Sequence, residues 1–278
     1  SVPRSIYESH EKHMDIGRRY LEGVRHVFQH ETGLAHPDNY HMFCRMLGSL
    51  QGLAPLSYGN EHDSWVSLAS NFTVKALHDV NLPPNSLHYL LNMWGRLAAS
   101  SERAARSDPS TPGGLLARII SMQAGHFDAD EGAGEEAKGA VETVNEKMGA
   151  VVVAYLEGRL EAISGAYDGL CEDPLEDPEM LQGQLEILPK LCGQQYASIA
   201  ADVIKIFDRH AEIYGSMLST NNPGKGRLEG QLAWLVRVCA ALIGGHYVVE
   251  KRIELDGAHM RPKAYLAANM QDGDQLVD

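Results

Sequence analysis

Apolar side chains recur along this chain with the period of an α-helix. Over residues 85–98 they fall three and four positions apart, which places them on one face of a helix. The same spacing predicts further helices over 20–28, 39–50, 179–192 and 196–218. Strand signals are weak, so the pattern predicts an all-α chain of helices joined by short polar turns.

Turn and capping residues mark the ends of several of these helices. Asp177 and Pro178 predict a helix start, because aspartate caps a first turn well and proline there gives up no hydrogen bond. Pro189 should kink or shorten the same helix, since it lacks an N–H and clashes with the preceding turn. Asn85 and Ser86 are candidate caps for the helix that follows two consecutive prolines.

Residues 231–244 are apolar on nearly every side. A membrane-spanning helix needs about 20 apolar residues, and this run is shorter and contains Arg237. We therefore predict a helix buried between two neighbours and no membrane insertion. Gly244 and Gly245 are the expected end of this helix. Three valines at 151–153 could start a short strand, but the residues after them continue with the helical period.

Two stretches interrupt the helical pattern and suggest how the chain is divided. Residues 100–114 are rich in Ser, Pro and Gly, and residues 127–137 are acidic and glycine-rich, so both predict loops. The predicted division has helical repeats over 1–101, an irregular acidic, glycine-rich insertion with a weak helix over 102–138, helical repeats over 139–257, and a C-terminal helix and tail over 258–278. Periodicity alone leaves the architecture open between a globular bundle and an α-solenoid of stacked antiparallel helix pairs.

The composition excludes some functions. The 278 residues carry a net charge of −13, and such a surface repels nucleic acid, so we expect no nucleic-acid partner. An acidic surface suits basic protein partners, although it also simply keeps a protein in solution. The four cysteines are widely spaced without a C-x-x-C pair, which argues against a zinc site or a disulfide framework.

The sequence offers little catalytic chemistry. His10 and His13, and likewise His26 and His30, could share a helix face, but no H-E-x-x-H frame or third ligand accompanies them. Residues 223–227 resemble a glycine-lysine loop, yet no strand precedes them and no Ser or Thr follows the lysine. No G-x-S-x-G elbow occurs. We expect no enzyme activity, no cofactor and no metal.

The most informative charge feature is an acidic stretch without a single Lys or Arg between Arg159 and Lys190. One interpretation is a turn followed by an acidic helix start, which the helix dipole favours. The other is an acidic ridge that attracts a basic partner electrostatically. The residues of this candidate partner-binding ridge are Glu172, Asp173, Glu176, Asp177 and Glu179.

Several ordered blocks of the chain resemble exportin-7 and its Ran-binding-protein relatives, with exportin-4 a related possibility at the same level. The blocks occur in the family's order and cover roughly residues 20–105 and 155–257. They are residues 39–47, 69–74, 84–91, 94–100, 167–178, 229–236 and 243–245. The stretch from about 102 to 150 and the tail after 257 have no counterpart in this pattern.

The resemblance implies an interior segment of a nuclear transport receptor of the importin-β superfamily. Such receptors are α-solenoids that bind the GTPase Ran in its GTP form and hold protein cargo. They contact the repeat proteins of the nuclear pore and shuttle between nucleus and cytoplasm, without catalysis. The segment matched here follows the repeats that carry the principal Ran-binding surface. The competing hypothesis is a generic helical-repeat interaction scaffold that is not linked to Ran.

Overall fold

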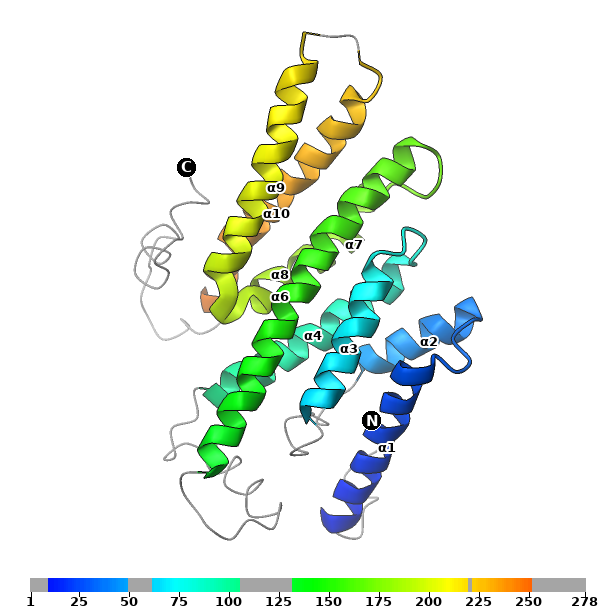
Figure 1. Cartoon of the computed structure of the whole chain (residues 1–278), viewed down its shortest axis with the longest axis vertical. Helices are drawn as coiled ribbons and strands as arrows, with labels where there is room; N and C mark the ends of the chain where they lie inside the picture. Colours follow the sequence, from blue (N-terminus) through cyan, green and yellow to red (C-terminus); the bar gives the residue numbers. More distant parts are fainter. Residues whose placement is uncertain (1–9, 50–61, 106–131, 220–221, 252–278) are drawn as a thin grey trace. The chain divides into compact units, whose positions relative to one another are not determined.

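The computed structural model describes residues 10–49, 62–105, 132–219 and 222–251, and these residues contain helices and turns but no strand (Figure 1). By contacts the chain divides into two units, Ser1–Ala76 with Asn85–Ala150, and Leu77–Pro84 with Val151–Asp278. The elements in chain order are α1 (His10–His30), α2 (Pro37–Gly48), α3 (His62–Leu77), α4 (Pro84–Ala105), α6 (Gly132–Tyr167), α7 (Pro178–Leu185), α8 (Leu188–Cys192), the 3₁₀ turn η4 (Gly193–Gln195), α9 (Tyr196–Met217) and α10 (Lys225–Lys251).

An aromatic cluster holds the first three helices of the first unit together. The ring centroid of Phe28, on α1, lies 5.7 Å from that of Phe43 on α2. The same ring lies 5.5 Å from Trp65 and 5.3 Å from Phe72, both on α3. Edge-on and tilted contacts at these separations are favourable beyond simple burial of apolar area. The apolar stripe of α1 therefore packs against α2 and α3.

A buried hydrogen bond joins α3 to α4. The side chain of Trp94 is completely buried, and its indole Nε1 donates to Oγ1 of Thr73 at 2.9 Å. The Thr73 hydroxyl in turn donates to the carbonyl oxygen of Ala69 at 2.8 Å. Each polar hydrogen in this chain of contacts thus has an acceptor, as a buried polar group requires.

The expected caps of α4 are wrong. The helix begins at Pro84, so Asn85 and Ser86 lie inside its first turn. Ser86 is buried, and its hydroxyl lies 2.9 Å from Nδ1 of His41 on α2. The Ser86 hydroxyl, which the local pattern predicted to cap α4, therefore makes a tertiary contact with α2.

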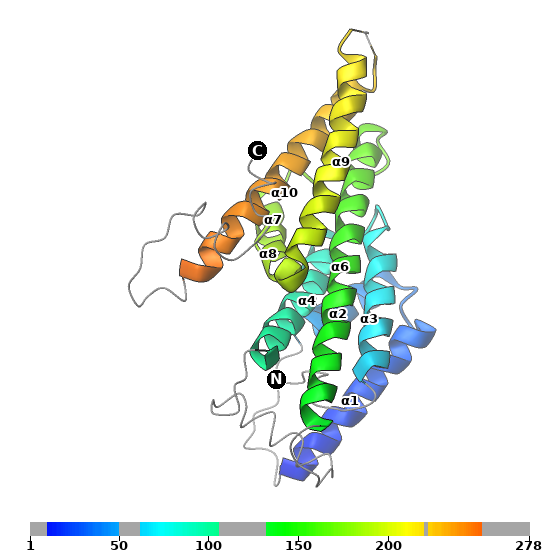
Figure 2. The same cartoon turned by 60° about the vertical axis from the view of Figure 1, so that its left-hand side comes forward.

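In the second unit α6 packs against α7 and α10. The hydroxyl of Tyr155, a completely buried residue of α6, donates to Oε1 of Gln184 on α7 at 3.1 Å. Its ring lies 5.9 Å from that of Trp234, which is completely buried on α10. The helices α9 and α10 form an antiparallel hairpin, as both views show (Figure 2). Stacked antiparallel pairs of this kind are what the sequence predicts.

The boundaries of α7 follow the local signals. Oδ1 of Asp177 accepts the N–H of Met180 at 2.9 Å, and Pro178 is the first helical residue, as predicted. The predicted single helix over 179–192 is interrupted near Pro189: α7 ends at Leu185, and α8 begins at Leu188. Proline at position 189 would clash with the carbonyl of residue 185 in a continuous helix, so the expected shortening is confirmed.

Other boundaries differ from the expectation. The helix α10 continues through Gly244 and Gly245 to Lys251, because a glycine inside a helix costs only about 1 kcal/mol relative to alanine and does not by itself end it. Residues 151–153 are helical, in α6. Parts of the predicted insertion over 102–138 are also helical: residues 102–105 belong to α4 and 132–138 to α6. The predicted weak helix and the segment over 258–278 lie outside the described residues.

Gly158 marks the closest approach of α6 to another backbone within the second unit. A Cβ atom added there would lie 1.9 Å from the carbonyl oxygen of Leu77, the last residue of α3. No real Cβ tolerates such a contact with backbone, so the packing of residues 77–84 on α6 requires glycine at this position. Sequence patterning gives no sign of this requirement, because the partner lies far away in the chain.

We predict that Gly158→Ala destabilises the chain by at least about 2 kcal/mol, since a rigid backbone overlap must be relieved by moving a helix. Gly215→Ala is the matched control, because a Cβ there meets nothing within 4 Å. Alanine should leave stability unchanged or raise it by roughly 0.5 kcal/mol at that exposed helical position. Urea unfolding followed by circular dichroism measures both. Equal stability of the two variants would contradict the close approach.

Candidate partner-binding surface

The acidic stretch forms the loop between α6 and α7. The helix α6 ends in a Schellman motif: the N–H of Leu170 bonds to the oxygen of Gly165 at 2.8 Å, and that of Gly169 bonds to Ala166 at 3.0 Å. Gly169 has a φ of 71°, in the left-handed region where glycine carries no steric penalty. This turn fixes the direction in which the acidic residues leave the helix.

Two of the five predicted ridge residues shape the loop itself. Oδ1 of Asp173 accepts the N–H of Leu175 at 2.9 Å, and its main-chain oxygen accepts the N–H of Glu176 at 3.1 Å. Asp177 caps α7, as described above. The interpretation of the stretch as a turn with an acidic helix start therefore describes these two aspartates well.

The other three ridge residues present their carboxylates to solvent. Glu172, Glu176 and Glu179 are exposed, and within the described residues none of the five ridge carboxylates forms an ion pair. The structure thus brings the five predicted residues into one loop and the first turn of one helix. Carboxylates placed in this way attract a basic partner over long range.

Arg159, the last basic residue before the acidic stretch, does not offset this charge at the surface. Its side chain is only 5% exposed, and its Nε and Nη2 have no acceptor among the described residues. Burial lowers the pKa of its guanidinium, while Tyr155 and Cys171 act in the opposite direction. The sequence places Arg159 at the start of the acidic stretch, but in the fold its guanidinium is buried.

Sequence reasoning missed two apolar side chains beside the acidic loop. Leu170 is 69% exposed and Tyr167 is 54% exposed, and the two lie three residues apart at the end of α6. The ring of Tyr167 lies over Gly226 and Gly230 of α10, where an added Cβ would come within 3.2 and 3.4 Å of it. The four-residue spacing of these glycines is the signal that could have indicated an aromatic ring on this face.

The residues of the weaker chemical motifs can be located in the structure. His26 and His30 are exposed, with ring centroids 4.5 Å apart, and no group of three metal-ligating side chains occurs within the described parts of the chain. Residues 224–227 pass from a turn into the start of α10. No described helix is long and apolar enough to cross a membrane. Burial raises the pKa of the Cys44 and Cys192 thiols to about 12, which suppresses the reactive thiolate.

Comparison with known proteins shows which family part of this chain is similar to. A family model described as "Exportin-7-like, TPR domain" matches residues 162–261. That stretch is similar to the TPR domain of exportin-7-like proteins. It begins in the last turn and a half of α6 and includes the acidic loop and the hairpin of α9 and α10.

The similarity to exportin-7 extends along most of the chain. Exportin-7-A of Xenopus laevis is 31% identical over 252 residues, which cover 88% of this chain and 20% of that protein. Ran-binding protein 16 of Drosophila melanogaster is 30% identical and Ran-binding protein 17 of Homo sapiens 28% identical; each alignment covers 92% of this chain and 21% of the relative. The chain therefore spans about a fifth of the length of these curated relatives. No solved structure matches it.

These findings confirm two predictions from the sequence. The resemblance to exportin-7 and its Ran-binding-protein relatives is confirmed over most of the chain. The fold class is confirmed as well, since the described residues form all-α helical pairs and the matched family domain is of the TPR type. The predicted division of the chain into repeats and an insertion remains a prediction.

The capping hydrogen bond of Asp177 can be tested separately from the negative charge of its side chain. We predict that Asp177→Ala destabilises the chain by about 1 kcal/mol, because the N–H of Met180 loses its acceptor. Asp177→Ser should retain most of the stability, since a serine hydroxyl can accept the same bond without a charge. Thermal and urea unfolding of both variants gives the comparison. Equal losses in the two would show that charge rather than capping stabilises this helix start.

Proposed function

We propose that this chain is a segment of a nuclear transport receptor that exports protein cargo from the nucleus, binding cargo and Ran in its GTP form without catalysis. The observation that carries the proposal is the similarity to exportin-7 and to Ran-binding proteins 16 and 17 over most of the chain. The names of those relatives supply the export and Ran-binding roles. The parent protein would shuttle between nucleus and cytoplasm and would contact the repeat proteins of the nuclear pore.

Within this proposal the acidic ridge is the part that meets a basic partner. The three solvent-facing glutamates give it long-range attraction, and the exposed side chain of Leu170 adds apolar area that a partner can bury. Aspartates at 173 and 177 hold the loop in shape, so the ridge does not have to order on binding. Electrostatic attraction of this kind mainly speeds association and selects the sign of the partner's charge.

The competing proposal is a helical-repeat interaction scaffold that is not linked to Ran. It shares the fold and the acidic surface, but it predicts binding that does not depend on the nucleotide state of Ran. Blocking Ran turnover should change the distribution of a tagged receptor between nucleus and cytoplasm, and should leave that of a scaffold unchanged.

We predict that the full-length parent protein recovers Ran locked in its GTP form at least about tenfold better than Ran locked in its GDP form. Pull-down with purified components measures the ratio, with a parent protein lacking this segment as a second sample. Equal recovery of both nucleotide forms would refute the receptor assignment. Loss of the preference on deleting the segment would place part of the Ran contact here.

A second prediction addresses the ridge. Replacing Glu172, Glu176 and Glu179 by lysine should weaken binding of a fluorescein-labelled lysine-rich peptide by about tenfold at low salt, because exposed ion pairs contribute up to about 1 kcal/mol each. The control is the same triple reversal at Glu142, Glu161 and Glu212, which are also exposed but lie on α6 and α9. Equal weakening by both triples would show that only net charge matters and would contradict a ridge.

A further inference from the structure

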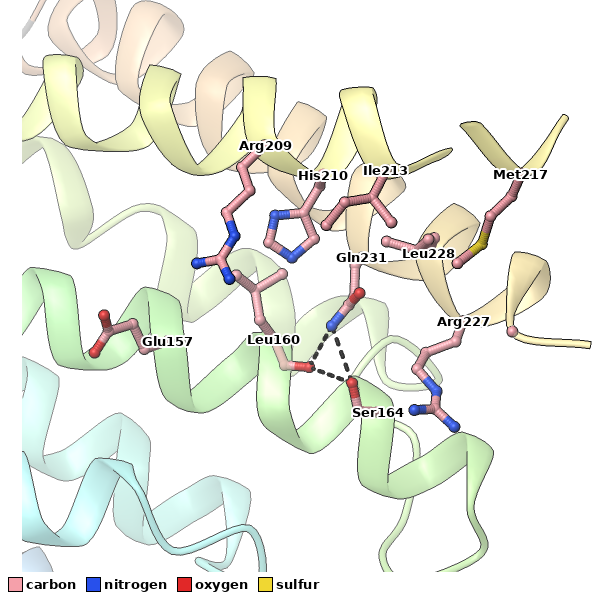
Figure 3. A pocket seen from close by; sticks show the side chains of 11 residues that line it. Glu157, Leu160, Ser164, Arg209, His210, Ile213, Met217, Arg227, Leu228 and Gln231 are labelled. Atoms are coloured by element: carbon pink, nitrogen blue, oxygen red, sulfur yellow. Dashed lines mark hydrogen bonds between the residues drawn. The ribbon is translucent and has the colours of Figure 1, made fainter. Parts of the chain in front are cut away.

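A groove of about 520 Å³ lies within the second unit, between α6 and the hairpin of α9 and α10 (Figure 3). One wall consists of Arg209, Ile213 and Met217, which follow one another at four-residue intervals and so share one face of α9. Leu160 of α6 and Leu228 of α10 line the apolar middle. Its volume falls within the range of about 300–1,000 Å³ that is typical of ligand sites.

The contact between α6 and α10 beneath the groove is fixed by buried hydrogen bonds. The amide Nε2 of Gln231, a buried residue of α10, donates to the carbonyl oxygen of Leu160 and to Oγ of Ser164, each at 3.0 Å. Figure 3 shows this amide pointing from α10 onto α6 between the two acceptors. These bonds satisfy the buried polar groups on both sides, so the groove is present before any ligand arrives.

The charges that line the groove are opposite to those of the chain as a whole. Arg209 is exposed and forms no ion pair within the described residues, Glu157 also lines the groove, and Arg227 lies at the other end from Arg209 (Figure 3). Nη2 of Arg227 donates to Oδ1 of Asp168 at 2.7 Å, while its Nε is buried without an acceptor in the described chain. The lining itself thus carries two guanidinium groups and one carboxylate, while Asp168, outside the lining, pairs with one of the two arginines.

We propose that this groove binds a short acidic segment of a partner protein, with a leucine- or isoleucine-sized side chain between carboxylates. The apolar side chain would lie against Ile213 and Leu228, and the carboxylates would accept hydrogen bonds from Arg209 and Arg227. Charge-assisted bonds of this kind are the strong ones, and a basic segment would instead meet like charges. The apolar middle is a poor match for a bare phosphate or a nucleic-acid backbone, because neither offers an apolar side chain to bury there.

The proposal stands apart from the transport role and from the acidic ridge. The ridge attracts basic partners, whereas the groove selects acidic ones, so the unit would contact two chemically different ligands. The ion pair between Arg227 and Asp168 connects the groove to the start of the acidic loop. Asp168 already occupies one donor of Arg227, so it acts as an internal competitor for the incoming carboxylate.

The test uses the full chain and fluorescence anisotropy of a fluorescein-labelled peptide in which two leucines alternate with glutamates. Arg209→Glu should weaken binding by about tenfold or more, because one strong charge-assisted contact becomes a repulsion. Arg237→Glu is the matched control, since this arginine is exposed on α10 but does not line the groove; its effect should stay within about twofold. For the apolar contact, Ile213→Asp changes a residue that lines the groove, and Val236→Asp, at an exposed position that does not line it, is the control.

Two further binding measurements test the proposal even if a groove variant folds poorly. Asp168→Asn should tighten binding by about threefold, because removing the competing carboxylate releases a donor of Arg227; general loss of structure would not strengthen binding. The peptide with lysine in place of glutamate should bind the unaltered chain at least about tenfold more weakly. Equal binding of the two peptides, equal weakening by the Arg209 and Arg237 variants, or no gain from Asp168→Asn would overturn the proposal. None of these measurements involves Ran, so failure here leaves the transport proposal unaffected.

Discussion

Every helix that buries an apolar stripe in this protein also has to satisfy the polar groups carried into the interior with it. In the second unit two such groups find their partners at contacts with α6. The phenol of Tyr155 bonds to Gln184 of α7, and the amide of Gln231 bonds to the backbone and a hydroxyl of α6. These bonds set how α7 and α10 align along α6, because sliding either helix would leave a buried donor without an acceptor. The groove and the acidic loop both take their shape from that alignment.

The features that could be predicted from sequence are those decided within a few residues. The cap at Asp177, the first helical position of Pro178 and the interruption near Pro189 depend only on neighbours along the chain, and all three were predictable. Gly244 and Gly245 misled the same reasoning, because a glycine only permits a helix to end. Packing and capping elsewhere decide whether it does.

Features that depend on distant partners were outside the reach of local patterns. Ser86 has the chemistry of a cap, yet a histidine 45 residues away takes its hydroxyl. In the sequence Gly158 cannot be told from any other helical glycine, and only the structure shows that the carbonyl of Leu77 lies against it. The groove is harder still, because Arg209, Arg227 and Leu160 come from three helices and carry no shared motif. The five acidic residues could be assigned to one loop and helix start because they lie close together in the sequence, and their role in binding a partner stays a prediction.

The Schellman turn at Gly169 helps to set the shape of the acidic loop without contributing to its charge. One glycine at the end of α6 and one capping aspartate at the start of α7 set where the loop leaves and rejoins the helices. Within the described part of the chain, the glutamates between and after them contribute to that framework only through the main chain, where the N–H of Glu176 bonds to Asp173. Substituting these glutamates would therefore change the charge of the loop without removing the contacts that shape it. The charge of this surface can vary independently of its geometry, as long as the glycine and the capping aspartate are kept.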